Sequence, residues 1–440
     1  MQSVTVMFRA AKWKAILPAI FFVMQATAQI NSPYSRYGLG DIYNARNVVS
    51  KAMGNVATAY SDYTSINFVN PASYSKLQLV TFDVSMEMEL RTLMNADRTE
   101  QTQSNYLLFN YMAVGVPLAK DKKGMTKWGM SFGIRPYSRV GYNIREDDRL
   151  PGIDSTTAYY QGSGGGYRAF LGMGYRIGNF SIGANAGYLF GQKDISTERL
   201  LISDTTFYFS SLQDTRTSYN NFGFDGGFQY KIKLGKETVA RIGANGFIGN
   251  TVNATQYKLR QTYLNNPSTG IDSIDVIQRT EEQKGTIEMP TGYTAAIAFE
   301  KEGKWMLSGE YESVSWSEFK FLDEPNVLAN TELFRFGGYY VPAPNDAKKY
   351  FKRVTYRAGF YTGKDMIVIQ GTQLPVWGAT MGFSLPIKKY SAYSTQYSTV
   401  NMSMEFGRRG NDQVPMSERF FRLNVGLSLS DLWFQKRKFD

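Results

Sequence analysis

The sequence contains no cysteine and no histidine among its 440 residues. Without cysteine the chain can form neither a disulfide bond nor a thiolate metal site. Without histidine it lacks the commonest general base and the commonest transition-metal ligand in proteins. A catalytic site built from carboxylates alone stays open, but no motif points to one. We therefore expect no enzyme activity, no catalytic residue, no metal site and no cofactor.

Long apolar runs are also missing after residue 28, where no stretch approaches the roughly 20 residues of a membrane-spanning helix. The one apolar run, Ala15 to Met24, follows three basic residues and precedes Ala26-Thr27-Ala28. Basic residues, a short apolar run and a small-x-small site are typical of a secretory signal peptide. We expect residues 1–28 to be removed and the mature chain to begin at Gln29. The alternative is an uncleaved anchor helix, for which the apolar run is short.

The formal net charge is +11, and three of the positive charges lie in the leader. A basic chain can bind nucleic acid, but an exported chain does not meet it, so we expect no nucleic-acid partner. The lysines favour short connecting segments, where they indicate either ordinary solubility or contact with anionic headgroups or an acidic partner. These lysines and one arginine are Lys120, Lys122, Lys123, Lys233, Lys236, Lys301, Lys304, Lys348, Lys349, Lys388, Lys389, Lys436, Arg437 and Lys438.

Aromatic residues and a period of two are abundant instead. Aromatics make up 15% of the chain, which favours strands. Within the stretch from Leu77 to Arg91 apolar and polar side chains alternate without a break for more than ten residues, from Val80 on, as they do on the two faces of a strand. Soluble strands are usually about five or six residues long, whereas a tilted strand that crosses a bilayer needs roughly 9 to 11. The stretch predicts a strand between lipid and a polar lumen, with Phe82, Met86 and Leu90 outside.

The same alternation recurs to the end of the chain and predicts about fourteen strands. Every second connection is short, as in Ile177-Gly178-Asn179, whereas the others are mostly long. Outer-membrane barrels show this asymmetry, with long outside loops and tight periplasmic turns. We therefore predict an all-β fold: a transmembrane antiparallel β-barrel of about 14 strands in the outer membrane, with both chain ends on the periplasmic side. The long connections are roughly 92–104, 143–163, 198–215, 256–285, 317–331 and 363–375.

Between the signal peptide and the first strand, residues 29–76 lack the alternation. They are rich in turn-formers and small residues, and they still contain aromatic and apolar side chains, which argues against a disordered leader. We predict an N-terminal hatch, or plug, over 29–76, the outer-membrane β-barrel over 77–434 and a basic periplasmic tail over 435–440. The hatch carries the motif Asn70, Pro71 and Ala72 just before the first strand.

With this hatch, the motif Asn70-Pro71-Ala72 and about fourteen strands, the chain resembles the FadL/TodX family of outer-membrane transport proteins. The resemblance implies a hatch that plugs the barrel and a path for hydrophobic molecules such as long-chain fatty acids. The opening Asn31-Ser32-Pro33-Tyr34-Ser35-Arg36-Tyr37-Gly38 and the ending Leu432-Trp433-Phe434 are similar to a branch found in Bacteroidetes. In that phylum similar barrels also serve as subunits of secretion and assembly complexes.

The predicted inner faces depart from an apolar fatty-acid path, because they carry many charges. One interpretation is a lumen locked to the hatch by ion pairs, since charges hidden from water need partners. In the other, Arg135, Arg139 and Arg168 anchor a carboxylate headgroup, which guanidinium groups match in a bidentate way. The inner charges are Asp83, Glu87, Arg135, Arg139, Arg168, Arg176, Asp225, Glu310, Arg353 and Glu405.

Two functions fit these features. The first is uptake of hydrophobic small molecules, of the long-chain fatty acid type, across the outer membrane. The alternative is a non-transporting barrel subunit of an outer-membrane secretion or assembly complex. The expected partners are membrane lipid, a hydrophobic small-molecule ligand and, for the alternative, other outer-membrane proteins.

Overall fold

A computed structural model describes residues 31–149, 155–203, 206–266, 270–322, 327–344, 346, 348–387 and 397–432. The predicted signal peptide and basic tail, Trp433, Phe434 and the lysine pair at 388–389 lie outside these residues. No helix in the described ranges is long and apolar enough to cross a membrane.

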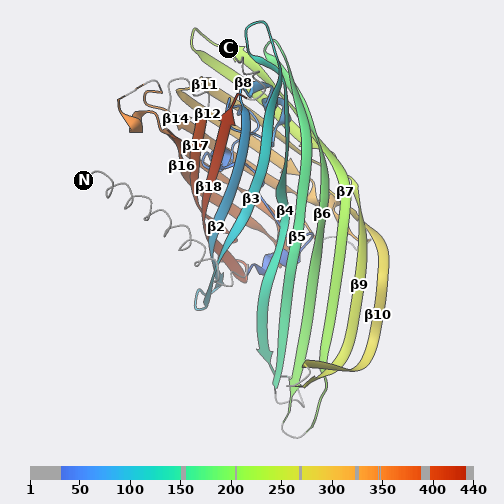
Figure 1. Cartoon of the computed structure of the whole chain (residues 1–440). Coiled ribbons are helices and arrows are strands. Elements are labelled where there is room, and N and C mark those ends of the chain that lie inside the picture. The colour runs from blue at the N-terminus through green and yellow to red at the C-terminus, as the bar shows by residue number, and fades with distance from the viewer. Residues whose placement is uncertain are drawn as a thin grey trace, which may run out of the picture.

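The described strands form one antiparallel sheet, and fourteen of them close into a ring in which the last strand pairs with the first. The number of strands predicted from the alternation is therefore confirmed (Figure 1). In ring order the strands are β2 (Val80–Asn95), β3 (Gln101–Lys120), β4 (Thr126–Asp148), β5 (Ser155–Ile177), β6 (Phe180–Ile202), β7 (Ser210–Lys233), β8 (Thr238–Phe247), β11 (Gly292–Lys301), β12 (Trp305–Val314), β14 (Thr331–Tyr340), β15 (Thr355–Ile369), β16 (Thr372–Ile387), β17 (Tyr397–Arg409) and β18 (Met416–Asp431).

The alternation on β2 reflects two environments, as predicted. Phe82 is 37% exposed and Leu90 43%, whereas Glu87 and Glu89 are each 1% exposed. Outward aromatic side chains collect near both ends of the ring, as in the pairs Trp128–Tyr175, Tyr188–Phe222 and Tyr311–Phe334. An apolar outer face between two aromatic girdles is typical of a barrel in the outer membrane. The short turns then mark the periplasmic end.

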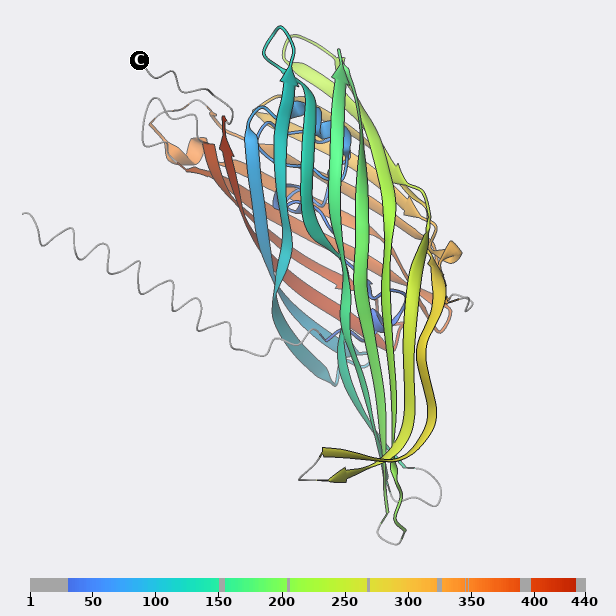
Figure 2. The ribbon, with the colours of Figure 1, turned by 45° about the vertical axis from the view of Figure 1, so that its right-hand side comes forward.

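Beyond the outer aromatic girdle the barrel wall continues on only one side of the ring. Strands β4 to β7 continue past the ring, and the hairpin of β9 (Thr251–Asn266) and β10 (Gly270–Glu288) joins them by pairing with the outer half of β7 (Figure 2). The prediction of long loops over 143–163, 198–215 and 256–285 is therefore wrong for the described residues there, since most of them are strand. Outside the bilayer neither face of a strand has to be apolar, so these extensions lack the alternation that identified the membrane strands.

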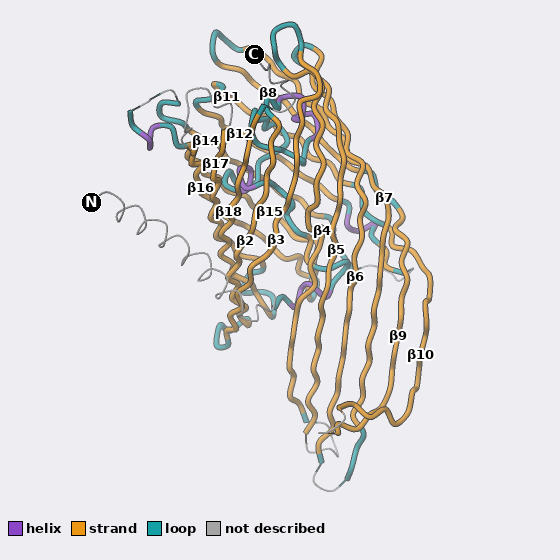
Figure 3. Tube along the Cα trace, in the orientation of Figure 1, coloured by secondary structure: helices purple, strands orange, loops and turns teal. Residues whose placement is uncertain are grey.

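A luminal segment, residues 32–76, runs inside the ring (Figure 3). Its elements are η2 (Pro33–Arg36), β1 (Asp41–Ile42), α2 (Val48–Lys51) and η3 (Pro71–Lys76). Asn47 and Asn70 cap α2 and η3, because each side chain accepts a hydrogen bond from a backbone N–H at the start of its helix.

This segment starts at the outer end of the barrel. The backbone N–H of Ser32 donates to the carbonyl of Gly141 (2.8 Å), and the Tyr34 hydroxyl donates to the carbonyl of Met416, both at outer strand ends. The segment contacts the periplasmic end at Tyr63, whose hydroxyl donates to Glu302 (3.5 Å), and it ends there with η3. The expectation of a periplasmic start is thus wrong for the first described residues, because a segment that fills the lumen can enter the first strand after crossing the whole barrel.

Candidate functional site

The predicted motif Asn70-Pro71-Ala72 sits against the wall formed by β5, β6 and β7. The Asn70 amide donates to the carbonyl oxygens of Thr58 (2.8 Å) and Phe228 (3.1 Å). Gly174 and Gly183 face Pro71 so closely that a Cβ atom on either would overlap its backbone. The motif therefore couples the luminal segment to the barrel by close backbone packing.

Lys51 fixes the middle of the luminal segment. Its ammonium group donates to the Glu87 carboxylate (2.6 Å), the Tyr43 hydroxyl (2.6 Å) and the amide oxygens of Asn110 and Asn424 (3.2 Å each). The side chain is fully buried, and burial lowers the pKa of Lys51, an effect that Glu87 partly offsets. A buried charge with several partners stays in place only while those partners stay.

Two further charges of the luminal segment form ion pairs with the wall, each on its own set of strands. Arg46 pairs with Glu310 (2.8 Å) and Glu312 (3.0 Å), and Arg335 pairs with both carboxylates as well. Asp41 is the second of these charges and lies between two arginines of the wall, Arg91 on β2 and Arg409 on β17.

Asp41 pairs with Arg409 (2.9 Å) and Arg91 (3.3 Å). Burial alone would raise the pKa of Asp41, but Arg409 and then Arg91 outweigh burial and hold the pKa below its usual value. The contribution of this contact to stability is fully present above the ordinary pKa of an aspartate. It is lost only as the pH falls through the lowered pKa.

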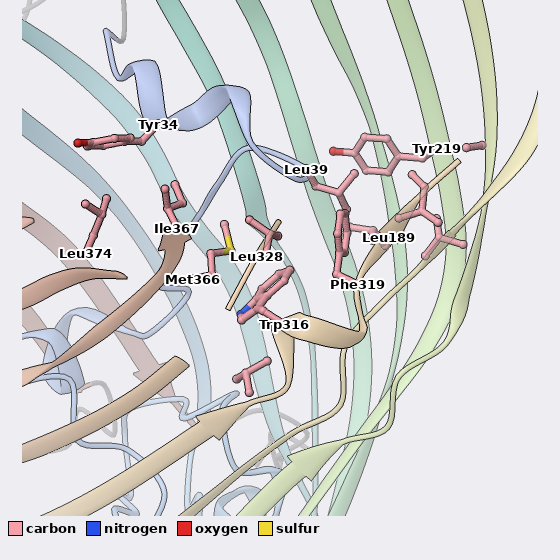
Figure 4. Packing of buried hydrophobic residues seen from close by; sticks show 14 of the residues in the cluster. Tyr34, Leu39, Leu189, Tyr219, Trp316, Phe319, Leu328, Met366, Ile367 and Leu374 are labelled. Atoms are coloured by element: carbon pink, nitrogen blue, oxygen red, sulfur yellow. The ribbon is translucent and has the colours of Figure 1, made fainter. Parts of the chain in front are cut away.

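A cavity of about 410 Å³ lies between the luminal segment and the wall. One side carries charges, including Arg135, Arg139 and Arg168. The other side is apolar and adjoins a buried cluster in which the outer part of the luminal segment packs on the wall and on inward-folded loops (Figure 4). The apolar lining includes Leu189, Val252, Met289, Val314, Trp316 and Met366.

The three predicted anchors differ in how well their charges are balanced. Arg168 pairs with Asp225, and Arg139 lies 3.6 Å from Glu87. Arg135 donates to the Ala45 carbonyl (3.1 Å), and its guanidinium group lies over the ring of Phe68, 5.2 Å from the ring centroid. Within the described ranges Arg135 makes no ion pair, so its positive charge faces the cavity without a carboxylate side chain as partner.

The other predicted inner residues do not line this cavity, apart from Glu87, Asp225 and Glu405. Asp83 accepts a hydrogen bond from Tyr111 (3.1 Å), and Arg176 pairs with Asp121 at a periplasmic turn (2.8 Å). Arg353 lies before β15, with its guanidinium group over the ring of Tyr350 (5.6 Å). Arg353 does not line this cavity, and its role as a lumen or ligand contact stays a prediction.

A family model described as BamG matches residues 8–440. The chain belongs to the BamG family. No curated protein matches it. Assignment to the Bacteroidetes branch stays a prediction.

Solved structures show the fold of this BamG-family chain. The Pseudomonas aeruginosa FadL homologue is 11% identical, with a TM-score of 0.55, over 89% of this chain and 99% of its own. The Pseudomonas putida toluene transporter TodX is 15% identical, with a TM-score of 0.54, over 89% and 99%. The CymD monoaromatic hydrocarbon channel is 14% identical, with a TM-score of 0.51, over 91% and 100%. The resemblance to FadL/TodX barrels inferred from the sequence is confirmed at the level of the fold.

The BamG-family barrel also has an interrupted wall beside the cavity. β7 pairs with β9 up to Asn220 and with β8 from Asp225, which leaves residues 221–224 without a strand partner on that side. The Asn250 amide bridges the interruption by donating to the Phe222 carbonyl (2.6 Å). Gly223 and Asn250 line the cavity, and Ile248 beside them is 82% exposed. The cavity therefore extends to the wall at the level of the outer girdle.

Sequence reasoning placed Glu405 on an inner face but did not predict the network of charges to which it belongs and which also lines the cavity. Arg91 pairs with Glu89 and Glu418, and Arg422 pairs with Glu89 and Glu405. Glu89, Arg91 and Arg422 stand on predicted polar faces, so alternation could have found them. Arg409 and Glu418 flank a turn beyond the predicted strand ends, where alternation gave no signal.

Proposed function

We propose that the barrel takes up hydrophobic small molecules that carry an anionic group, of the long-chain fatty acid type, across the outer membrane. The observation that supports this most is the cavity, because it joins an apolar side to the unpaired guanidinium group of Arg135. Its volume falls within the roughly 300 to 1,000 Å³ of small-molecule sites, which are mostly apolar with a few polar anchors. A guanidinium group is the side chain best suited to a carboxylate.

In this proposal the molecule enters through the interrupted wall between β7 and β8. Phe222 is 62% exposed and Phe224 69% on the outer surface there, so an apolar molecule meets apolar side chains before it reaches the cavity. The solved barrels with this fold include a hydrocarbon channel and a toluene transporter, which supports transport of hydrophobic compounds as the general role. The luminal segment then acts as a hatch that has to shift before the molecule reaches the periplasm.

Replacing Arg135 with methionine is expected to weaken binding of a long-chain fatty acid by roughly 10- to 100-fold, since a charge-assisted hydrogen bond contributes about 1.5–3 kcal/mol. Binding of the alcohol of the same chain length is expected to stay unchanged, because the apolar side of the cavity is intact. Native mass spectrometry on the purified barrel with both ligands measures the difference.

Arg145→Met is the matched control, because Arg145 is exposed on the outer extension of β4 and pairs only with Asp147 among the described residues. Equal affinities of acid and alcohol for the unaltered protein would contradict the role of Arg135 as an anchor. Failure of both ligands to bind would contradict uptake itself.

A second function, a barrel subunit of an outer-membrane assembly or secretion complex, is supported by apolar side chains at the outer tip. Phe207 is 71% exposed and Phe209 44%, and Ile271 on β10 is 51% exposed. Ser210, next to Phe209, pairs with Tyr263 of β9, and Tyr263 pairs with Ser273 of β10. Phe207, Phe209 and Ile271 therefore lie close together, beyond the bilayer. Exposed apolar patches of this kind mark protein interaction sites.

Crosslinking in native membranes tests this second function. A partner that is lost in a Phe207→Ser, Phe209→Ser variant and kept in Arg145→Met would support a complex. A barrel that forms no crosslink to another protein, with or without these substitutions, would exclude the complex.

A further inference from the structure

The periplasmic rim carries a surplus of positive charge. Four of the connections at this end contain one acid each, and every one of these acids is paired. Asp121 binds Arg176 (2.8 Å), Glu237 binds Lys301, Glu302 binds Lys76 (2.5 Å) and Lys231 (2.8 Å), and Asp346 binds Lys352 (3.4 Å). The remaining lysines of these connections make no ion pair within the described part of the chain: Lys120, Lys122, Lys123, Lys233, Lys236, Lys304, Lys348 and Lys349.

These lysines belong to four connections that follow β3, β7, β11 and β14, so they are spread around the ring rather than gathered on one side. A protein partner would meet only one sector of such a ring. A bilayer surrounds the barrel and therefore meets the whole ring of lysines, next to the aromatic girdle at the periplasmic end. The distribution therefore favours an anionic membrane surface over an acidic protein.

The connection between β14 and β15 adds apolar side chains to this charge. It holds the short helix η5 (Tyr350–Lys352), the orange helix at the same end as the C label in Figures 1 and 2. The Ala343 N–H donates to the Lys352 carbonyl (2.8 Å), and the Tyr356 hydroxyl donates to the Phe351 carbonyl (3.0 Å). The loop is thus fixed by its own hydrogen bonds.

This fixed loop presents Phe351, which is 74% exposed and lies edge-on to Tyr350, with ring centroids 5.7 Å apart. Arg353 covers the ring of Tyr350, and Lys348 and Lys349 are exposed beside it. Tyr340, at the adjoining end of β14, is 50% exposed on the outer surface. An exposed aromatic pair with flanking cations next to an aromatic girdle is the composition of an interfacial membrane contact.

We propose that the β14–β15 connection is a binding site for anionic phospholipid of the periplasmic leaflet. Lys348 and Lys349 bind the headgroup phosphate, and Phe351 enters the boundary between headgroups and acyl chains. This role is separate from the lumen cavity and does not depend on transport.

The test uses the full-length purified barrel and phosphatidylglycerol or phosphatidylcholine as probe, with bound lipids counted by native mass spectrometry. A K348Q, K349Q double variant is expected to bind phosphatidylglycerol about 30-fold more weakly, because each lysine near an anionic surface contributes roughly a factor of five. Binding of phosphatidylcholine should not change. F351S should weaken both lipids, since it removes only the apolar contact.

The control is a K258Q, K284Q double variant, which removes two lysines from the outer hairpin β9–β10 and should leave lipid binding unchanged. Equal losses in this control and in the rim variant would overturn the proposal. So would an unaltered preference for phosphatidylglycerol in the rim variant. Selective capture of an acidic periplasmic protein by the rim lysines, with lipid binding unaffected, would assign them to a protein partner instead.

Discussion

Replacing Lys51 with methionine is expected to release the luminal segment while the barrel stays folded. The substitution leaves the Glu87 carboxylate buried without its closest cation, and breaking a buried pair in this way costs about 3–5 kcal/mol. Arg139, 3.6 Å from the same carboxylate, offsets part of this cost, so we expect about 3 kcal/mol. Hydrogen exchange of the backbone amides of residues 43–60 measures the loss of protection.

Lys76→Met is the matched control for this experiment. Lys76 lies in the same luminal segment and also pairs with a glutamate, Glu302, but that carboxylate is 34% exposed. Solvent-exposed pairs contribute about 0–1 kcal/mol, so protection of residues 43–60 should change little. Similar exchange rates in both variants would contradict a locking role for the Lys51–Glu87 pair.

Replacing Gly183 with leucine is the second change with a large expected effect. A Cβ atom at this position of β6 would overlap the Pro71 backbone, so the side chain and η3 cannot occupy the same space. We expect η3 to leave the wall and the lumen to conduct ions, because in the proposed function η3 belongs to the hatch that closes the periplasmic end. Conductance of single barrels in planar bilayers measures the opening.

Gly309→Leu is the control for the steric change. Gly309 lies on β12, and a Cβ atom there would meet only the ring of Phe336, at 3.5 Å. This substitution adds the same volume to the barrel without touching the luminal segment, and conductance should stay at the level of the unaltered protein. A Gly183→Leu barrel that stays closed would show that η3 is not what blocks the lumen.

The membrane strands and their two faces could be predicted from the sequence alone. A bilayer and a polar lumen impose opposite demands on successive residues, so the period of two is recorded locally, as in Phe82 and Glu87 of β2. The same reasoning gave fourteen strands and placed Arg135, Arg139 and Arg168 on the inner face. It failed where the bilayer ends, at the β9–β10 hairpin, because no apolar face is required there.

Which charges pair with each other depends on how the chain folds in three dimensions. Lys51 reaches Glu87 and Asn424 because closure of the ring through β2 and β18 brings residues from both ends of the chain around the luminal segment. Likewise, among the described residues Arg135 has no acidic partner, whereas Arg168 pairs with Asp225 on β7, and the alternation does not predict this difference. The period of a strand specifies the side to which a residue points, but its partners depend on strand register, ring closure and the path of the segment inside.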